Sequence, residues 1–338
     1  MRGEGLARFA NALLRRLARE GEPALPDPSS DPLAALVARE SVPEWLARRV
    51  LASLGPEGAC AWAAAQNTPP PVWLRVNQTR TSRRDVEAMI AATAPRAKVV
   101  PESPLPEAVA VRQAASPADL QPVREGLATV QDLGAQLVGR LLGAHEGERI
   151  LDACSGLGGK ATHLAELAGG RALIHAVDLS GKKLRLLQEH ARRLGLAGIR
   201  AVEADLCAAA APLEEDYDRV LLDAPCTGLG VIRRHPELKW RRGEEDVMRL
   251  ASVQKALLEA VARRVRVGGV LVYAVCSFSH EEGEAQVMMF LKEHPGFRLE
   301  PPEDPCVVPF LDDKGLLRTW PHVHNADGFV AARFRRMA

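Results

Sequence analysis

Two cysteines in this chain follow apolar runs in settings that suit a reactive thiol. Cys226 follows the segment Leu-Leu-Asp-Ala-Pro, and Cys276 follows the segment Leu-Val-Tyr-Ala-Val. A single cysteine in such a place is usually a buried packing residue. Two thiols at the ends of adjacent strands favour a chemical role, because a thiol on a turn near a helix N-terminus can reach the nucleophilic thiolate state. We therefore expect Cys226 and Cys276 to face one crevice.

A glycine-rich turn lies between an apolar run and a helical pattern earlier in the chain. It reads Ile150-Leu-Asp-Ala-Cys-Ser-Gly-Leu-Gly-Gly-Lys160. Its glycines let a ligand approach the backbone, and the following helix offers free N–H groups. The spacing matches neither the dinucleotide nor the phosphate-loop pattern, so pyrophosphate and nucleoside triphosphates are poor candidates. The turn predicts a nucleotide-cofactor site, and a tight strand-to-helix turn is the alternative.

Acidic residues follow the next strands. Asp178 ends an apolar run about twenty residues after the glycine turn, where a carboxylate can bind ribose hydroxyls. Asp205 follows the strand after that, and Asp152, at the end of the run before the glycine turn, is the third acid. Asp178 alone could equally cap the next helix. Together they would repel a pyrophosphate but attract a sulfonium and an ammonium group. This combination indicates S-adenosylmethionine.

Strands and helices alternate from about residue 126 in a way that would bring these residues together. Strands are expected at 149–153, 172–178, 199–204, 219–224, 270–276 and 328–334, and helices at 131–142, 160–168, 181–194, 244–267 and 281–293. The alternation predicts an α/β domain with a mostly parallel, doubly wound sheet. Ligands of such sheets bind at the carboxyl ends of the strands, so the acids and cysteines are expected to form one pocket.

The part of the chain before residue 126 has a different character. Amphipathic helices are expected at 3–20, 42–54 and 57–66, the second with a capping box at Ser41 and Glu44. A β-rich run within 69–77, a helix over 85–92 and strands near 97–100 and 108–111 suggest a small α+β module. Its arginines are predicted to form either a solvated face or a surface for the RNA backbone: Arg75, Arg80, Arg83 and Arg84. We expect three parts, a helical segment 1–67, an RNA-binding module 68–125 and a catalytic domain 126–338.

Composition sets bounds on the class of protein. The 338 residues include 47% hydrophobic and 26% charged ones, which is ordinary for a globular protein with a sizeable core. No run of about 18 apolar residues and no signal-peptide pattern occur, so we expect a cytoplasmic protein without a membrane partner. We also expect a monomer. The six cysteines include no C-x-x-C pair, and we expect no metal. A net charge of +1 argues against a strongly basic nucleic-acid binder.

Several segments together resemble the Sun-type (Fmu) RNA cytosine-5 methyltransferases. They are Asp152-Ala-Cys-Ser-Gly-Leu-Gly-Gly-Lys160, Asp178, Asp205, Asp223-Ala-Pro-Cys-Thr-Gly-Leu-Gly230, Arg233-Arg-His-Pro-Glu-Leu-Lys-Trp240, Tyr273-Ala-Val-Cys-Ser277 and His324-Asn-Ala-Asp-Gly-Phe329. The resemblance runs from about residue 40 to the end. Within the family, Arg-Arg-His-Pro favours the branch that acts on bacterial 16S rRNA.

The resemblance implies a Rossmann-like, S-adenosylmethionine-dependent enzyme that methylates C5 of a cytosine in RNA. Cys276 would be the nucleophile that adds to C6, Cys226 would help to release the product, and Asp223 would hydrogen-bond the base. The cofactor would contact Cys154, Ser155, Gly156, Leu157, Gly158, Gly159, Lys160, Asp178, Asp205 and Asp223. The target base must leave its stack to reach such a site, which favours loops or unfolded rRNA.

The sequence departs from the family in three places. Ser155-Gly-Leu157 stands where Ala-Ala-Pro is usual, and Glu281-Glu-Gly-Glu284 stands where Glu-Glu-Asn-Glu is common. Residues 3–20 are similar to only the last helix of the antitermination-factor-like domain that usually precedes the module. A tRNA cytosine-5 methyltransferase and a non-catalytic rRNA-binding assembly factor are the alternatives to a 16S rRNA enzyme. A dehydrogenase is disfavoured by the glycine spacing.

Overall fold

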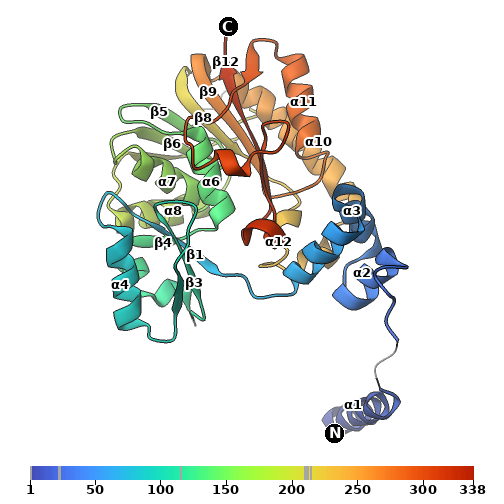
Figure 1. Cartoon of the computed structure of the whole chain (residues 1–338). Helices are drawn as coiled ribbons and strands as arrows, with labels where there is room; N and C mark the ends of the chain where they lie inside the picture. The colour runs from blue at the N-terminus through green and yellow to red at the C-terminus, as the bar shows by residue number, and fades with distance from the viewer. Residues whose placement is uncertain (1, 22–23, 115, 209–212, 214) are drawn as a thin grey trace. The chain divides into compact units, whose positions relative to one another are not determined.

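The computed structural model describes residues 2–21, 24–114, 116–208, 213 and 215–338 (Figure 1). The chain divides into two compact units, Met1–Ala64 and Ala65–Ala338. Among the described helices, none has both the length and the apolar character that crossing a bilayer requires.

The first unit is helical. It contains α1 (Arg2–Glu20), α2 (Pro32–Glu40) and most of α3 (Glu44–Gln66). The sequence did not predict α2, which begins at Pro32 because the Asp31 side chain accepts a hydrogen bond from the Ala34 amide at 2.9 Å. The capping box expected at Ser41 is wrong, since Ser41 ends α2 in a left-handed conformation with φ 53°. The two helices expected at 42–54 and 57–66 are both present and are joined in α3 across a kink at Gly55, whose backbone is not helical (φ 68°).

A small antiparallel sheet begins the second unit. Its strand order is β2 (Lys98–Val100), β3 (Ala108–Arg112), β1 (Val72–Val76), β4 (Ala128–Val130). The helices α4 (Arg83–Thr93) and α5 (Gln121–Arg124) complete the module, with the short 3-10 helix η1 (Pro117–Asp119) between β3 and α5. Side chains that alternate along β1 and β3 pack with Val86 and Ile90 of α4 into a core of the module's own. The expected α+β character of this region is confirmed.

Both sequence-based interpretations of Arg75 are wrong, because its side chain is fully buried. Its Nε and Nη2 donate to the Glu166 carboxylate at 2.7 and 3.0 Å. The remaining N–H groups bond the Gln131 side chain, the Gly159 carbonyl and the Thr162 hydroxyl, so all five guanidinium donors have partners. Arg75 is therefore a structural residue that connects β1 to α7.

The large sheet has the order β10 (Phe297–Leu299), β12 (Phe329–Arg336), β9 (Val265–Val275), β8 (Tyr217–Asp223), β5 (Arg149–Asp152), β6 (Leu173–Asp178), β7 (Ile199–Glu203), and β11 (Leu317–Thr319) pairs with β12. The five strands from β9 to β7 are parallel, whereas β12 runs antiparallel to its neighbours. The expected mostly parallel α/β fold is confirmed. The strand order reverses between β5 and β8, which is where such sheets bind ligands.

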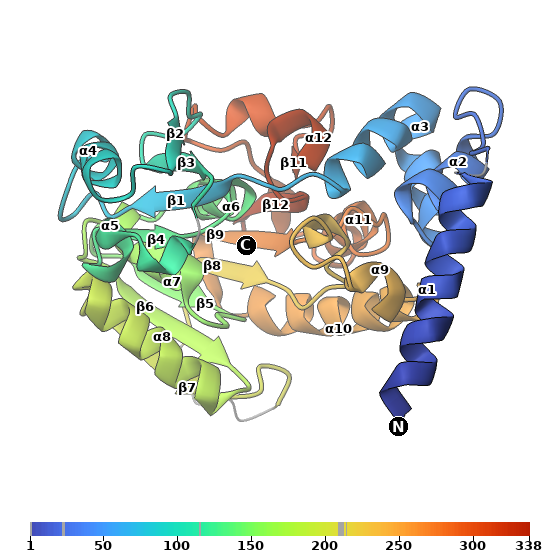
Figure 2. The ribbon, with the colours of Figure 1, turned by 90° about the horizontal axis from the view of Figure 1, so that it is seen from below.

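Helices cover both faces of this sheet. One core contains residues of α6 (Leu133–Leu142), α7 (Gly159–Leu167) and α8 (Gly181–Leu194), and a second contains residues of α10 (Glu244–Ala262) and α11 (Glu284–Glu293). Figure 2 shows that α8 lies alongside β6 and β7 and that α10 lies alongside β8. The shorter elements are η2 (Leu229–Val231), α9 (Leu238–Arg241), η3 (Val308–Phe310) and α12 (Pro321–His324).

The helix expected over 244–267 is too long. It ends at Ala262, and the strand β9 begins at Val265. Residues 265–267 read Val-Arg-Val, an alternation with a period of two that belongs to a strand rather than a helix. The strand is therefore longer than the expected 270–276. Cys276 directly follows its last residue, Val275.

Candidate functional site

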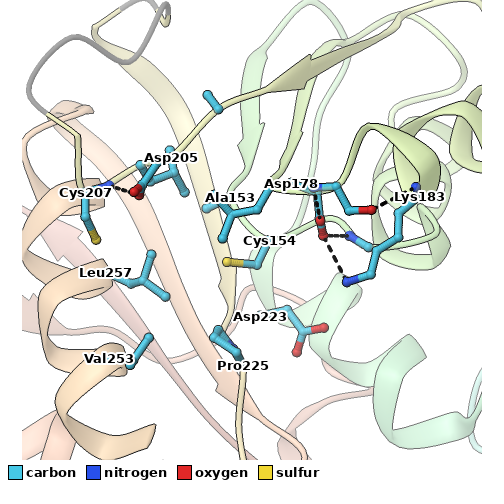
Figure 3. Close-up of a pocket in the computed structure, with 15 residues that line it drawn as sticks. Ala153, Cys154, Asp178, Lys183, Asp205, Cys207, Asp223, Pro225, Val253 and Leu257 are labelled. Carbon is cyan, nitrogen blue, oxygen red and sulfur yellow. Dashed lines mark hydrogen bonds and ion pairs between the residues drawn. The ribbon is translucent and has the colours of Figure 1, made fainter.

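A pocket opens at the carboxyl ends of the parallel strands (Figure 3). Its volume is about 430 Å³. The lining residues come from the ends of β5, β6, β7 and β8 and from α10: Ala153, Cys154, Gly156, Asp178, Leu179, Ser180, Lys183, Ala204, Asp205, Leu206, Cys207, Asp223, Pro225, Val253 and Leu257. Asp178, Asp205 and Asp223 therefore share one cavity, whereas Asp152 is buried and does not line it.

Asp178 fixes the turn that follows β5. One carboxylate oxygen accepts the Gly156 amide at 3.0 Å, and the other accepts the Ser180 amide at 2.9 Å. The Lys183 ammonium lies 3.6 Å from the same carboxylate. Asp205 accepts the Cys207 amide at 2.9 Å but is exposed toward the cavity mouth. Both carboxylates keep lone pairs for a ligand in the pocket.

Only some residues of the glycine turn line the cavity. Of the residues expected to contact a cofactor, Cys154 and Gly156 line it, whereas the lining does not include 155 or 157–160. Ser155 is buried, and its hydroxyl donates to the Val177 carbonyl at 3.1 Å. Leu157 is exposed. Gly158 has φ +83°, and a Cβ there would lie 2.4 Å from Leu187, so only glycine fits.

Lys160 points from the first turn of α7 toward the end of β8. Its Nζ lies 2.6 Å from Asp223 and 5.1 Å from the ring centroid of Phe329. Burial acts to lower the pKa of Lys160, but Asp223 outweighs this effect, and the pKa is raised. Lys160 also interacts electrostatically with Cys276. It therefore stays cationic and acts electrostatically on one of the two expected catalytic thiols.

Asp152 lies beneath the glycine turn and is completely buried. Neither carboxylate oxygen accepts a well-formed hydrogen bond from the described residues, although the Ala161 amide is close enough to favour its charge. Burial raises the pKa of Asp152 to about 7, and Asp223 acts in the same direction. A buried acid with so few partners is uncommon, and Asp152 itself does not line the pocket.

The sulfur atoms of Cys226 and Cys276 meet at the ends of β8 and β9. The distance between them is 3.2 Å, and both residues are half-buried. The hydrogen bond with Cys276 and burial together raise the pKa of Cys226 well above its usual value. Cys226 therefore holds its proton, whereas Cys276 is the thiol that interacts electrostatically with the cationic Lys160.

The other cysteines near the pocket are less suited to nucleophilic chemistry. Burial is the main cause that raises the pKa of Cys154, and the neighbouring acids add to it. Burial and Asp205 raise the pKa of Cys207.

No group of three or more potential metal ligands occurs within the described ranges.

Sequence reasoning missed two parts of the site. Val253 and Leu257 line the pocket from α10, four residues apart on one helix face. That spacing is the only signal, and it also describes any core helix. Glu282 is buried between the turns that follow the two cysteines. Its sequence context, Glu281-Glu-Gly-Glu284, gives no sign of burial.

Comparison with protein families decides the affiliation of the chain. A family model described as 16S rRNA methyltransferase RsmB/F matches residues 140–335, more than half of the chain. The chain belongs to this family. A second model, for the ferredoxin-like domain of RsmF/B-like methyltransferases, matches residues 42–117. The resemblance inferred from the cysteine segments is confirmed, and the chain is an RNA methyltransferase.

Curated relatives in the RsmB/F family match nearly the whole chain. The probable ribosomal RNA small subunit methyltransferase B of Bacillus subtilis (strain 168) is 36% identical over 338 residues, which are 98% of this chain and 74% of the relative. The ribosomal RNA small subunit methyltransferase B of Escherichia coli O6:K15:H31 is 37% identical over 328 residues, with 96% and 72% coverage.

Solved structures agree with the fold of the RsmB/F family member described here. The crystal structure of PH0851 matches with a TM-score of 0.84 and 30% identity, covering 94% of this chain and 70% of that chain. The structure of NSun6 from Pyrococcus horikoshii with SFG has a TM-score of 0.78 at 23% identity, covering 88% and 99%. At that identity the second likeness concerns the fold alone.

Proposed function

We propose that the chain transfers a methyl group from S-adenosylmethionine to C5 of a cytosine in 16S rRNA, through a transient bond between Cys276 and C6. The observation that carries the proposal is the pair of thiols 3.2 Å apart, next to an acid-lined pocket. Asp223 and Pro225 belong both to the pocket lining and to the turn that leads to Cys226. In this proposal residues 68–125 form a module that helps to bind the RNA.

The residues of the pocket fit S-adenosylmethionine. A cavity of about 430 Å³ lies within the range of small-ligand sites, roughly 300–1,000 Å³. Leu206, Val253 and Leu257 offer an apolar surface for an adenine ring, while Asp178 and Asp205 offer acceptors for hydroxyl or ammonium groups. When bound there, S-adenosylmethionine would supply a methyl group activated by its sulfonium.

The two cysteines have different roles in the proposed reaction: Cys276 attacks the base, and Cys226 assists its release. The Cys276 thiolate adds to C6, and the electron pair of the C5–C6 double bond makes C5 nucleophilic enough to accept the methyl group. Loss of the C5 proton and of the C6–S bond then restores the ring. Cys226 carries a proton next to the Cys276 sulfur. It can donate a hydrogen bond to that sulfur as the C6–S bond breaks.

Asp223 is proposed to accept a hydrogen bond from the N4 amino group of the cytosine, held in place by Lys160 at 2.6 Å. Asp223→Asn keeps the shape and removes the charge. We expect the rate of methyl transfer to fall by about 10- to 100-fold, equivalent to about 1.5–3 kcal/mol for a hydrogen bond to a charged group. Single-turnover kinetics measure this. Asp313→Asn, an exposed acid outside the pocket, is the matched control, and equal rates for both variants would remove Asp223 from the mechanism.

The acids on β6 and after β7 provide a test of the cofactor assignment. Asp178→Ala and Asp205→Ala should each weaken S-adenosylmethionine binding by about 1.5–3 kcal/mol, because each removes a charged hydrogen-bond acceptor from the cavity. Isothermal titration calorimetry measures the affinity, with Asp313→Ala as the control. An unchanged affinity in both pocket variants would contradict the assignment.

The proposed reaction is tested by incubating the protein with labelled S-adenosylmethionine and with 16S rRNA or tRNA. We expect label in 16S rRNA, at a cytosine that bisulfite treatment fails to convert. Label in tRNA alone would identify a tRNA enzyme instead. RNA binding without any transfer of label would indicate a non-catalytic assembly factor.

A further inference from the structure

The Glu282 carboxylate joins the two turns that carry the cysteines. Glu282 is fully buried and lies between β9 and α11. One oxygen accepts the backbone N–H of Thr227, the residue after Cys226, at 2.8 Å. The other accepts the hydroxyl of Ser277, the residue after Cys276, at 2.6 Å. A single side chain thus contacts the neighbour of each thiol.

Further donors hold this carboxylate in one orientation. The Thr227 hydroxyl donates to Oε2 at 2.5 Å, the Ser279 hydroxyl donates to the same oxygen at 3.1 Å, and the Gln254 amide donates to Oε1 at 3.0 Å. The Tyr273 hydroxyl donates to the main-chain carbonyl of Glu282 at 2.5 Å. With five donors for about four lone pairs on its two oxygens, the carboxylate has no acceptor capacity left.

We propose that Glu282 is a positioning residue, which sets the separation and orientation of Cys226 and Cys276 through Thr227 and Ser277. The inference rests on the proposed function, because it assigns Glu282 a purpose in the thiol chemistry. Thr227 and Ser277 directly follow the cysteines, so a shift of either turn displaces a sulfur atom. In a reaction that needs the two sulfurs and the base in contact, a displacement of about 1 Å can cost about 100-fold in rate.

The chemistry of the contacts explains why a carboxylate is required. All five side-chain contacts of Glu282 are made by N–H or O–H donors. A glutamine of the same shape would replace one accepting oxygen by an NH₂ group, which only donates. In one orientation this group would face the Thr227 and Gln254 N–H groups. In the other it would face three hydroxyls, which would all have to rotate away.

The test is Glu282→Gln, measured in two ways. Methyl transfer should fall by about 100-fold, while the Kd for S-adenosylmethionine and the KM for RNA stay within about twofold. In the absence of RNA, diamide should couple Cys226 and Cys276 more slowly than in the unchanged protein, because the sulfurs no longer start 3.2 Å apart. Peptide mass spectrometry quantifies the disulfide. Glu284→Gln is the matched control, since Glu284 pairs with Lys314 and Arg318 instead.

The two measurements separate this inference from the proposed function. Slower coupling together with slower transfer supports the positioning role. An unchanged coupling rate overturns it, and so does slower coupling with normal transfer. If the unchanged protein methylates no RNA, the proposed function fails, whereas the coupling rate still shows whether Glu282 sets the geometry of the thiols. If Glu282→Gln does not fold, Thr227→Val and Ser277→Ala replace it, because each removes one hydroxyl contact and should slow both processes to a smaller extent.

Discussion

Cys276→Ala should lose methyl transfer by at least about 10⁴-fold, the scale on which removal of a catalytic nucleophile acts. It should still bind RNA and S-adenosylmethionine, because Cys276 is not part of the pocket lining. Cys226→Ala should behave differently. Its Cys276 thiolate can still attack, but the bond to the base breaks slowly, so a covalent protein–RNA complex should accumulate. Denaturing gel electrophoresis with labelled RNA detects that complex.

Three controls make this result specific. The complex should require S-adenosylmethionine, should be missing from the double variant, and should not form with Cys60→Ala, which alters a cysteine of the helical unit. A complex trapped by Cys276→Ala rather than by Cys226→Ala would reverse the two roles. Normal turnover in both single variants would show that the thiols are packing residues.

Arg75→Met should lower the free energy of unfolding by about 3–5 kcal/mol, the cost of removing one partner from a buried ion pair. The change leaves the Glu166 carboxylate without its cationic partner, at a place where burial already raises the pKa of that group. It also removes donors from Gln131, Gly159 and Thr162. Urea denaturation followed by circular dichroism measures the loss.

Arg84→Met is the matched control for this experiment. Arg84 is an exposed arginine of the same module, and its replacement should change the free energy of unfolding by no more than about 0.5 kcal/mol. Adding Glu166→Leu to Arg75→Met should recover part of the stability, because the unpaired buried charge is gone. Similar stability of the two single arginine variants would show that the buried pair contributes little.

Local patterns predicted the features that depend on neighbours along the chain. Alternation of apolar runs and helical periods located β5, β6, β7 and β8. Their shared edge predicted one pocket, which Asp178, Asp205 and Asp223 line and Asp152 does not. The same rule predicted that two thiols at adjacent strand ends would face one crevice, and their sulfurs are 3.2 Å apart. The part boundaries at 67 and 125 stay predictions.

Contacts between residues that are distant in the sequence were not predicted. Arg75 was expected to be at the surface because arginines usually are, and its burial depends on Glu166, 91 residues later. Glu282 lies among glutamates whose sequence gives no sign that one of them is buried against Thr227, 55 residues earlier. Neither contact follows from periodicity or propensity, because both arise only when separate elements pack.

The buried guanidinium of Arg75 limits which segments of two related proteins can be combined in one chain. It extends from β1 to α7, and its five donors bond Gly159, Thr162 and Glu166 of that helix and Gln131. A chimaera that takes the small sheet, together with Gln131, from one relative and the α7 segment from another would fold well only if that segment offers an acid at position 166. β1 and α7 are therefore expected to be inherited together, even though Arg75 and Glu166 are 91 residues apart in the sequence.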